Sequence, residues 1–221
     1  MKITDNAFVV PNVVANTYIL VDTDGLTIID AGLPGSTKKI LGYIASLGKS
    51  PQDVKRIVIT HSDLDHIGGL AALQKATGAR TYASRIEAEA IAKGKPSRDI
   101  KRSGFSLRGI LFPLLAPFFK AAPVQIHEIV AEGQTLGGLQ VLETPGHTPG
   151  HISLFAPSIG VLFCGDSMVA EKKGLLGSRP GITWDESRAR ASERKQAALG
   201  ARIVCSGHGP VVMDVADKFP V

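Results

Sequence analysis

Residues 60–69 read Thr-His-Ser-Asp-Leu-Asp-His-Ile-Gly-Gly and overlap the end of an apolar run, Val-Lys-Arg-Ile-Val-Ile-Thr, at 54–60. The apolar run predicts a buried strand, so two imidazoles and two carboxylates gather where that strand ends. Imidazole nitrogen suits zinc and iron, and carboxylate oxygen suits harder cations. The segment therefore predicts a metal site at the end of a strand.

Three further fragments repeat this arrangement later in the chain. They are Gly-His-Thr-Pro-Gly-His at 146–151, Cys-Gly-Asp at 164–166 and Ser-Gly-His-Gly at 206–209. Each follows an apolar, strand-like run and contains a potential metal ligand. Their recurrence indicates that the first cluster is not a coincidence.

The four fragments, in this order and spacing, resemble the metallo-β-lactamase fold hydrolases. The pattern of that family is His-x-His-x-Asp-His, then a His, a bridging Asp and a last His. The resemblance extends from the turn Ile-Ile-Asp-Ala-Gly at 28–32 to His208. It implies an α/β fold, a four-layer αββα sandwich of two mixed sheets flanked by helices. It is specific for fold and metal site and only weakly specific for substrate.

The length of 221 residues predicts a single domain over residues 1–221, and the apolar pattern predicts strands alternating with helices. The predicted strands lie near 18–21, 26–29, 54–60, 81–82, 138–143, 151–156, 160–164 and 202–205. The predicted helices lie at 36–47, with Ser36 as N-cap and Gly48 as stop, and near 69–77, 85–93 and 185–199.

The resemblance implies two adjacent metal sites. Site one would use His61, Asp63 and His147, site two would use Asp65, His66 and His208, and Asp166 would bridge them. Two divalent ions, zinc or else iron or manganese, would share a hydroxide that attacks the substrate. Asp65, which would help to orient this hydroxide, and Asp166 are the expected catalytic residues.

Asp63 departs from the family pattern, which has His at this position. An Asp oxygen reaches as far from Cα as Nδ1 of His, so Asp63 can still bind metal. The alternative is that Asp63 only hydrogen-bonds nearby and leaves site one weak or empty. With Asp63 as a ligand, the three carboxylates bring the ligand charge to −3 instead of −2. We expect this charge to raise the pKa of the bound water and to favour harder metals.

Two further residues are expected to support the ligands. His151 lies four residues after His147 at the start of a strand, and we expect it to hydrogen-bond a ligand. Asp30 follows an apolar strand and could orient a ligand His, although a simple turn role is nearly as plausible. Cys164 and Cys205 are interpreted as small buried strand residues.

Residues 94–123 interrupt the alternation of strands and helices. Their first part is basic, and their second part, 110–119, is apolar and contains Pro113 and Pro117, which prevent a long helix. We consider three interpretations: a loop that covers core, a lid over an apolar substrate group, and a membrane-surface or dimer contact. The lid would place four side chains in the substrate pocket, namely Phe112, Leu115, Phe118 and Phe119.

The composition is that of an ordinary globular protein, with 44% hydrophobic and 20% charged residues in 221. The first residues lack the pattern of a signal peptide, no apolar run reaches the roughly 18 residues of a membrane span, and two cysteines cannot form a disulfide framework. We therefore expect a cytoplasmic monomer or homodimer without stable membrane insertion. The net charge of +5 alone does not indicate a nucleic-acid partner.

The leading functional hypothesis is a binuclear hydrolase that cleaves an ester, thioester or lactone of a small molecule with an apolar group. A phosphodiesterase is one alternative, supported by the basic stretch 93–108. A di-iron oxidoreductase or dioxygenase is another. Flavodiiron proteins resemble this family and have a carboxylate, Glu, where Asp63 stands, and persulfide dioxygenases are a related option.

Overall fold

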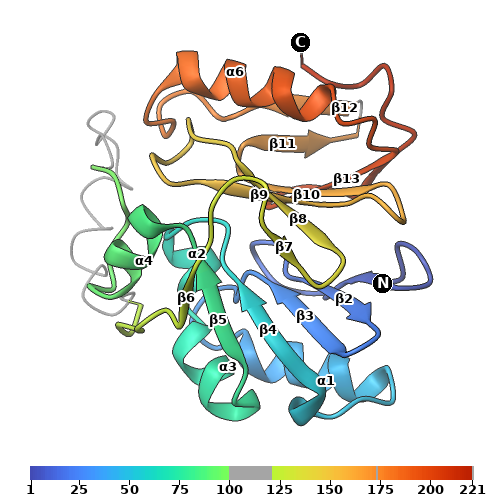
Figure 1. Cartoon of the computed structure of the whole chain (residues 1–221), viewed down its shortest axis with the longest axis vertical. Coiled ribbons are helices and arrows are strands. Elements are labelled where there is room, and N and C mark those ends of the chain that lie inside the picture. The colour runs from blue at the N-terminus through green and yellow to red at the C-terminus, as the bar shows by residue number, and fades with distance from the viewer. Residues whose placement is uncertain (100–120, 173, 221) are drawn as a thin grey trace.

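The computed structural model describes residues 1–99, 121–172 and 174–220. Two six-stranded sheets lie face to face, and helices cover their outer faces (Figure 1). Each sheet contains both parallel and antiparallel pairs. The predicted four-layer αββα sandwich is therefore confirmed.

The first sheet, in the order β1-β2-β3-β4-β5-β6, comes from the N-terminal part of the chain. The first three strands are antiparallel, and β4, β5 and β6 continue parallel to β3. The strands are β1 (Ala7–Val9), β2 (Tyr18–Asp22), β3 (Gly25–Ile29), β4 (Val54–Val58), β5 (Arg80–Ala83) and β6 (Glu128–Ile129).

The second sheet, in the order β14-β13-β10-β9-β8-β7, comes from the C-terminal part, and its β10–β13 pair is parallel. Its strands are β7 (Thr135–Leu136), β8 (Leu139–Glu143), β9 (Ile152–Ala156), β10 (Val161–Gly165), β13 (Ile203–Ser206) and β14 (Val212–Met213). A separate hairpin is formed by β11 (Met168–Glu171) and β12 (Gly174–Gly177).

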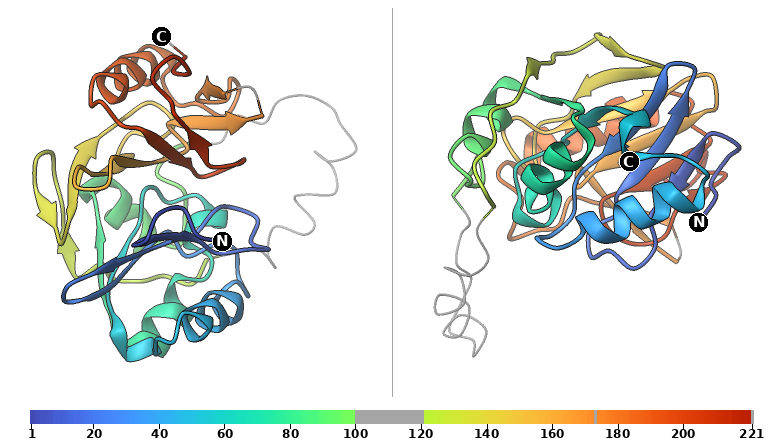
Figure 2. Two further views of the ribbon diagram at one scale, coloured as in Figure 1. Left: turned by 90° about the vertical axis from the view of Figure 1, so that its right-hand side faces the viewer. Right: turned by 90° about the horizontal axis from the view of Figure 1, so that it is seen from below.

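Helices form the two outer layers, as the views in Figure 2 also show. On the side of the first sheet lie α1 (Thr37–Ser46), α3 (Leu70–Thr77) and α4 (Arg85–Ile91), together with the short α2 (Leu64–Ile67) and a 3-10 turn at Pro51–Asp53. On the second sheet lies α6 (Glu186–Ala197). The first helix ends before Gly48 (φ +70°) as predicted, but the expected capping bond from Ser36 is absent, because this residue already has helical dihedrals.

Alternation along the strands divides the interior into three apolar layers. Ile19, Ile28 and Ile57 pack against the helices of the first half. Their neighbours, including Tyr18 and Ile29, point into the space between the two sheets. A third cluster joins the second sheet to the segment that follows α6. This packing joins the two sheets into one scaffold, and the loops at their common edge can carry a site.

Most of the interruption at 94–123 lies outside the described residues. The four predicted pocket residues, Phe112, Leu115, Phe118 and Phe119, belong to this part, so their role stays a prediction. Over the described ranges, no helix combines the length and the apolar character that crossing a membrane requires.

Candidate metal centre

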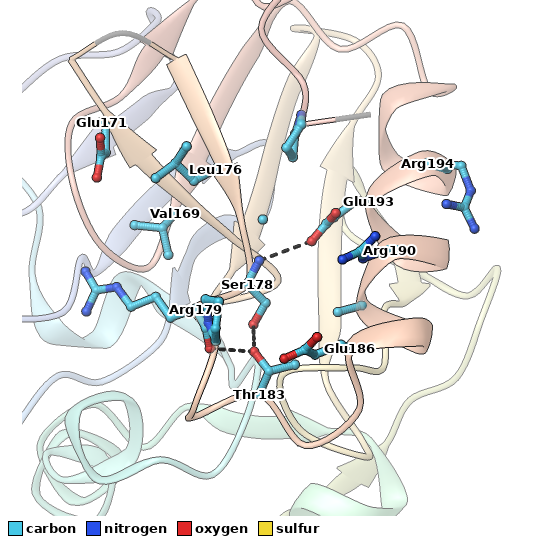
Figure 3. A pocket seen from close by; sticks show the side chains of 14 residues that line it. Val169, Glu171, Leu176, Ser178, Arg179, Thr183, Glu186, Arg190, Glu193 and Arg194 are labelled. Carbon is cyan, nitrogen blue, oxygen red and sulfur yellow. Dashed lines mark hydrogen bonds between the residues drawn. The ribbon is translucent and has the colours of Figure 1, made fainter. Parts of the chain in front are cut away.

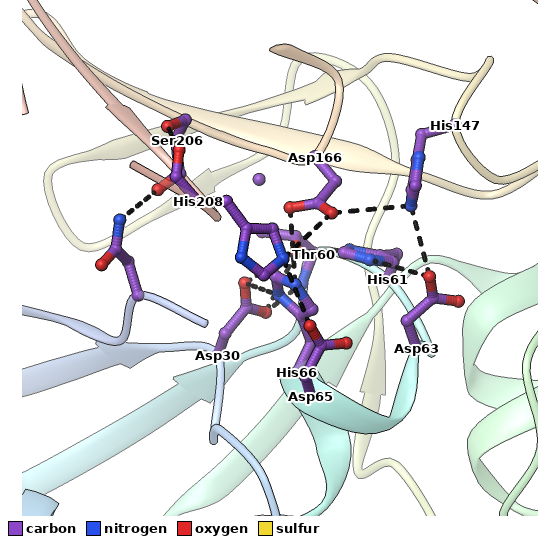
Figure 4. Close-up of polar contacts among 12 residues, drawn as sticks. Asp30, Thr60, His61, Asp63, Asp65, His66, His147, Asp166, Ser206 and His208 are labelled. Atoms are coloured by element: carbon purple, nitrogen blue, oxygen red, sulfur yellow. Dashed lines mark hydrogen bonds and ion pairs between the residues drawn. The ribbon is translucent and has the colours of Figure 1, made fainter. Parts of the chain in front are cut away.

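All seven predicted ligands lie together at one edge of the sandwich (Figure 4). The first four lie after β4, in the loop to α2 and on α2 itself. His147 lies between β8 and β9, Asp166 directly after β10, and His208 after β13. Because β4, β10 and β13 all end at this edge, residues far apart in sequence become neighbours.

The ligand atoms form two groups with Asp166 between them. His61, His147 and Asp166 make one group, and Asp65, His66 and His208 make the other, with the atoms of each group within 4.8 Å of one another. Asp166 Oδ2 lies 3.7 Å from His147 Nε2 and 3.4 Å from His208 Nε2. The Asp166 carboxylate thus has the placement that a bridging ligand needs.

Three buried polar atoms in the centre have no hydrogen-bond partner among the described residues: His61 Nε2, His66 Nε2 and Asp166 Oδ1. Burying such atoms without a partner is costly. Divalent cations held by the two ligand groups would satisfy these atoms, and the mixture of imidazoles and carboxylates suits zinc, iron or manganese. The residues present therefore fit a divalent metal centre.

Hydrogen bonds at Nδ1 orient the rings of His61 and His66. His66 Nδ1 lies 2.8 Å from Asp30 Oδ2, and His61 Nδ1 lies 3.0 Å from Thr60 Oγ1. Asp30 also accepts bonds from the backbone N–H and the hydroxyl of Thr60. Asp30 thus does more than form a turn, because it orients His66 so that Nε2 faces the centre.

His151 is placed differently from the ligands. Its Nε2 accepts a hydrogen bond from the backbone N–H of Asp166 at 3.1 Å, so its Nδ1 donates to Thr144 Oγ1 at 2.8 Å. Burial lowers the pKa of His151 well below its ordinary value, which keeps the ring neutral. His151 therefore fixes the position of Asp166, as expected from the sequence.

Charges within the cluster shift the titration of its members. Hydrogen bonds to Asp166 and Asp65 raise the pKa of His208 to about 9. Burial alone would raise the pKa of Asp166, but the charge of His66 and close contacts with His208 and His66, each at 3.4 Å, outweigh it and hold this pKa well below the usual range. The carboxylate thus stays ionised and ready for a cation.

Asp63 has a partner that the sequence analysis did not identify. Arg98 Nη1 and Nη2 donate to Asp63 Oδ1 and Oδ2 at 2.5 and 2.8 Å. Asp63 Oδ2 also lies 3.3 Å from His147 Nε2 and 3.7 Å from His61 Nε2. The expected ligand charge of −3 left out this guanidinium, which brings the local total back to −2.

A buried carboxyl group, Glu87 on α4, holds the ligand loops together. Its Oε2 accepts from the N–H of Ser62 at 2.8 Å. Its Oε1 accepts from Thr148 Oγ1 at 2.7 Å, from Gly150 N at 3.0 Å and from Ser97 Oγ at 2.8 Å. Glu87 thereby connects the loop of His61, the loop of His147 and the segment that carries Arg98.

A cavity of about 560 Å³ lies between the β11–β12 hairpin and α6 (Figure 3). Ser178 lines it, and Ser178 Oγ lies 3.2 Å from His147 Nδ1 and 2.8 Å from Thr183 Oγ1. These two contacts support the His147 ring at Nδ1, while its Nε2 faces the ligand cluster. Sequence reasoning had no signal for it, because Ser178 lies in none of the four fragments.

Close packing explains the glycines beside two of the ligands. A Cβ at Gly207 would collide with Oδ1 of Asp166, and a Cβ at Gly146 (φ +147°) would collide with the backbone of Ala189. Both cysteines are buried as expected, and burial raises the pKa of each thiol.

Comparison with known proteins agrees with this geometry. The family model described as the metallo-beta-lactamase superfamily matches residues 10–208. The probable metallo-hydrolase YqgX of Bacillus subtilis is 30% identical, over 89% of this chain and 85% of the relative. A hydroxyacylglutathione hydrolase of Cereibacter sphaeroides is 32% identical over 75% of the chain, which spans about half (52%) of that enzyme.

Solved structures agree as well. A Cronobacter sakazakii metallo-beta-lactamase with a HARLDQ motif superposes with a TM-score of 0.72 at 27% identity, covering 95% of this chain and 77% of that one. On this evidence, the chain belongs to the metallo-beta-lactamase superfamily and is a metal-dependent hydrolase.

Proposed function

We propose that the chain hydrolyses an ester, thioester or lactone of a small molecule at a two-metal centre. The observation that carries this proposal is the pair of adjacent ligand groups, in which the buried atoms His61 Nε2, His66 Nε2 and Asp166 Oδ1 have no hydrogen-bond partner among the described residues. Two divalent cations, zinc being the expected metal, would lower the pKa of a shared water and polarise the substrate carbonyl.

The residues of the chain have distinct parts in this reaction. Asp166, with one oxygen near both His147 and His208, would keep the two ligand groups in register. Asp65 is more exposed than the other ligands, with 30% of its side chain accessible, and lies 3.2 Å from His208. It is therefore placed to orient the attacking water from the open side. A side-chain nucleophile is not required.

The choice of an acyl substrate draws on the relatives. Hydroxyacylglutathione hydrolases match this chain at about 30% identity, and their name denotes removal of an acyl group from a thiol compound. This resemblance favours a carbonyl substrate over a phosphodiester. We further place the enzyme in the cytoplasm, which the two free buried thiols support.

The experiment is a substrate panel with metal-loaded protein: p-nitrophenyl esters, an S-acyl thiol, a lactone and bis-p-nitrophenyl phosphate. We expect turnover of an acyl substrate, and a fall of roughly three orders of magnitude in kcat for Asp166→Asn. The exposed Asp5→Asn serves as the matched control.

Near-normal turnover by metal-loaded Asp166→Asn would contradict the mechanism. Turnover of the phosphodiester alone would instead support the phosphodiesterase alternative. Two iron ions per chain with a visible absorption band and no hydrolysis would support the oxidoreductase alternative.

A further inference from the structure

Arg98 and Asp63 form an ion pair inside the ligand cluster. Only 3% of the Arg98 side chain is exposed, and both of its terminal nitrogens bind the Asp63 carboxylate. Arg98 Nη2 also lies 3.3 Å from His147 Nε2. The guanidinium thus contacts two of the side chains that site one would need for its metal.

The backbone around Arg98 is anchored from both halves of the protein. The N–H of Ser97 donates to Ser62 Oγ at 2.8 Å, and Ser97 Oγ donates to Glu87. Arg98 Nε donates to the carbonyl of Ile182 at 3.0 Å. These contacts hold Arg98 from several sides, so the surrounding fold keeps its guanidinium against Asp63.

The charge of the pair has a direct consequence for metal binding. Arginine keeps its proton under all ordinary conditions, so the Asp63–Arg98 pair is neutral overall. The pair therefore has the same net charge as the neutral His of the family pattern. Both carboxylate oxygens of Asp63, however, are already bonded to Arg98. A divalent cation in site one would lie beside a fixed positive charge and would compete with it for Asp63.

Site two lacks this competition among the described residues. The side chains of Asp65, His66 and His208 make their ion-pair contacts with Asp30, Asp166 and one another. We propose that Arg98 is an internal cation that competes with metal at site one, so that the centre is asymmetric and site two binds metal first. This inference rests on the ligand set of the proposed function.

The test is a titration of chelator-treated protein with zinc, followed by calorimetry and native mass spectrometry. We expect the wild-type chain to bind one zinc tightly and a second about tenfold or more weakly. Arg98→Met frees Asp63 and should tighten the second site by about tenfold or more, whereas Arg98→Lys keeps the charge and should tighten it less. Arg80→Met, which breaks an exposed pair with Glu128, is the matched control.

A second variant guards against misfolding of Arg98→Met, which leaves Asp63 without its cation. The double variant Asp63→His, Arg98→Met restores the neutral His of the family pattern. Its two sites should bind zinc with affinities similar to each other. Two equally tight sites in the wild type, or a second site that Arg98→Met leaves unchanged or weakens, overturn the inference while the proposed function stands. A wild-type chain that binds no zinc overturns both.

Discussion

Asp30 Oδ2 lies 2.8 Å from Nδ1 of His66, and both side chains are buried. Because Nδ1 is occupied by this bond, Nε2 is the atom left for a metal. Asp30 has a left-handed backbone (φ +61°), which Asn tolerates as well as Asp. Asp30→Asn therefore changes the charge and the orientation of His66 with little effect on the turn.

We expect Asp30→Asn to weaken metal binding at site two by about ten- to a hundredfold, since the imidazole loses its orienting carboxylate. Competition with a chromophoric chelator measures this affinity. Asp24→Asn, which alters an exposed partner of Arg56, should leave it unchanged. Equal affinities in both variants would show that Asp30 has no part in positioning His66.

Glu87 offers a test of how the ligand loops are held together. Glu87→Gln places an amide N–H₂ against donors from Ser62, Thr148 and Gly150, so at least one buried donor loses its acceptor. We expect a loss of about 2–3 kcal/mol in the free energy of unfolding, measured by urea denaturation. Glu89→Gln, on the exposed face of the same helix, should change stability by less than about 0.5 kcal/mol.

His208 should make the stability of metal-free protein depend on pH. Its folded pKa of about 9 lies above the ordinary value of 6.5, so protonation favours the folded state. This contribution is complete below about pH 6.5 and is lost as the pH rises through about 9.

Chelated wild-type protein should therefore lose stability between these pH values, and His208→Ala should lose less, by on the order of 2 kcal/mol after allowance for solvent screening. Urea denaturation at pH 6.5 and 9 gives the comparison, with the exposed His127→Ala as control. Parallel pH profiles for wild type and His208→Ala would refute it.

Cys164 and Cys205 should be unreactive while the protein is folded. Both lie in central strands, and burial raises the pKa of each thiol, so little thiolate is present at neutral pH. A disulfide reagent that reports thiols should detect none in native protein and two after denaturation. Rapid reaction of either thiol in the native state would contradict this assignment.

The four fragments were enough to predict the fold and to bring seven side chains to one edge. Long apolar runs such as those at 54–60 and 160–164 also predicted their strands. Sequence patterns did not reveal β1, β11 and β12, which have three or four residues. They also did not reveal β6, β7 and β14, because a two-residue strand has no periodicity to detect. These two-residue strands are defined by their pairing alone, β6 with the distant β5 and β7 and β14 with the nearby β8 and β13.

Arg98 and Glu87 were missed for a related reason. The basic stretch 93–108 was noticed, but nothing in it distinguishes Arg98 from its neighbours. Glu87 looks like any other acidic residue on an amphipathic helix. Their importance arises from contacts with Asp63 and Ser62, which only the folded chain brings within reach.

The division of the ligands between the two sheets also bears on folding kinetics. His61 and His66 belong to the first half, whereas His147 and Asp166 belong to the second. A complete set of donor atoms exists only after the halves have docked, so a bound cation would stabilise the native state more than the folding transition state. Metal would then slow unfolding and barely change the refolding rate, making the centre a source of kinetic stability.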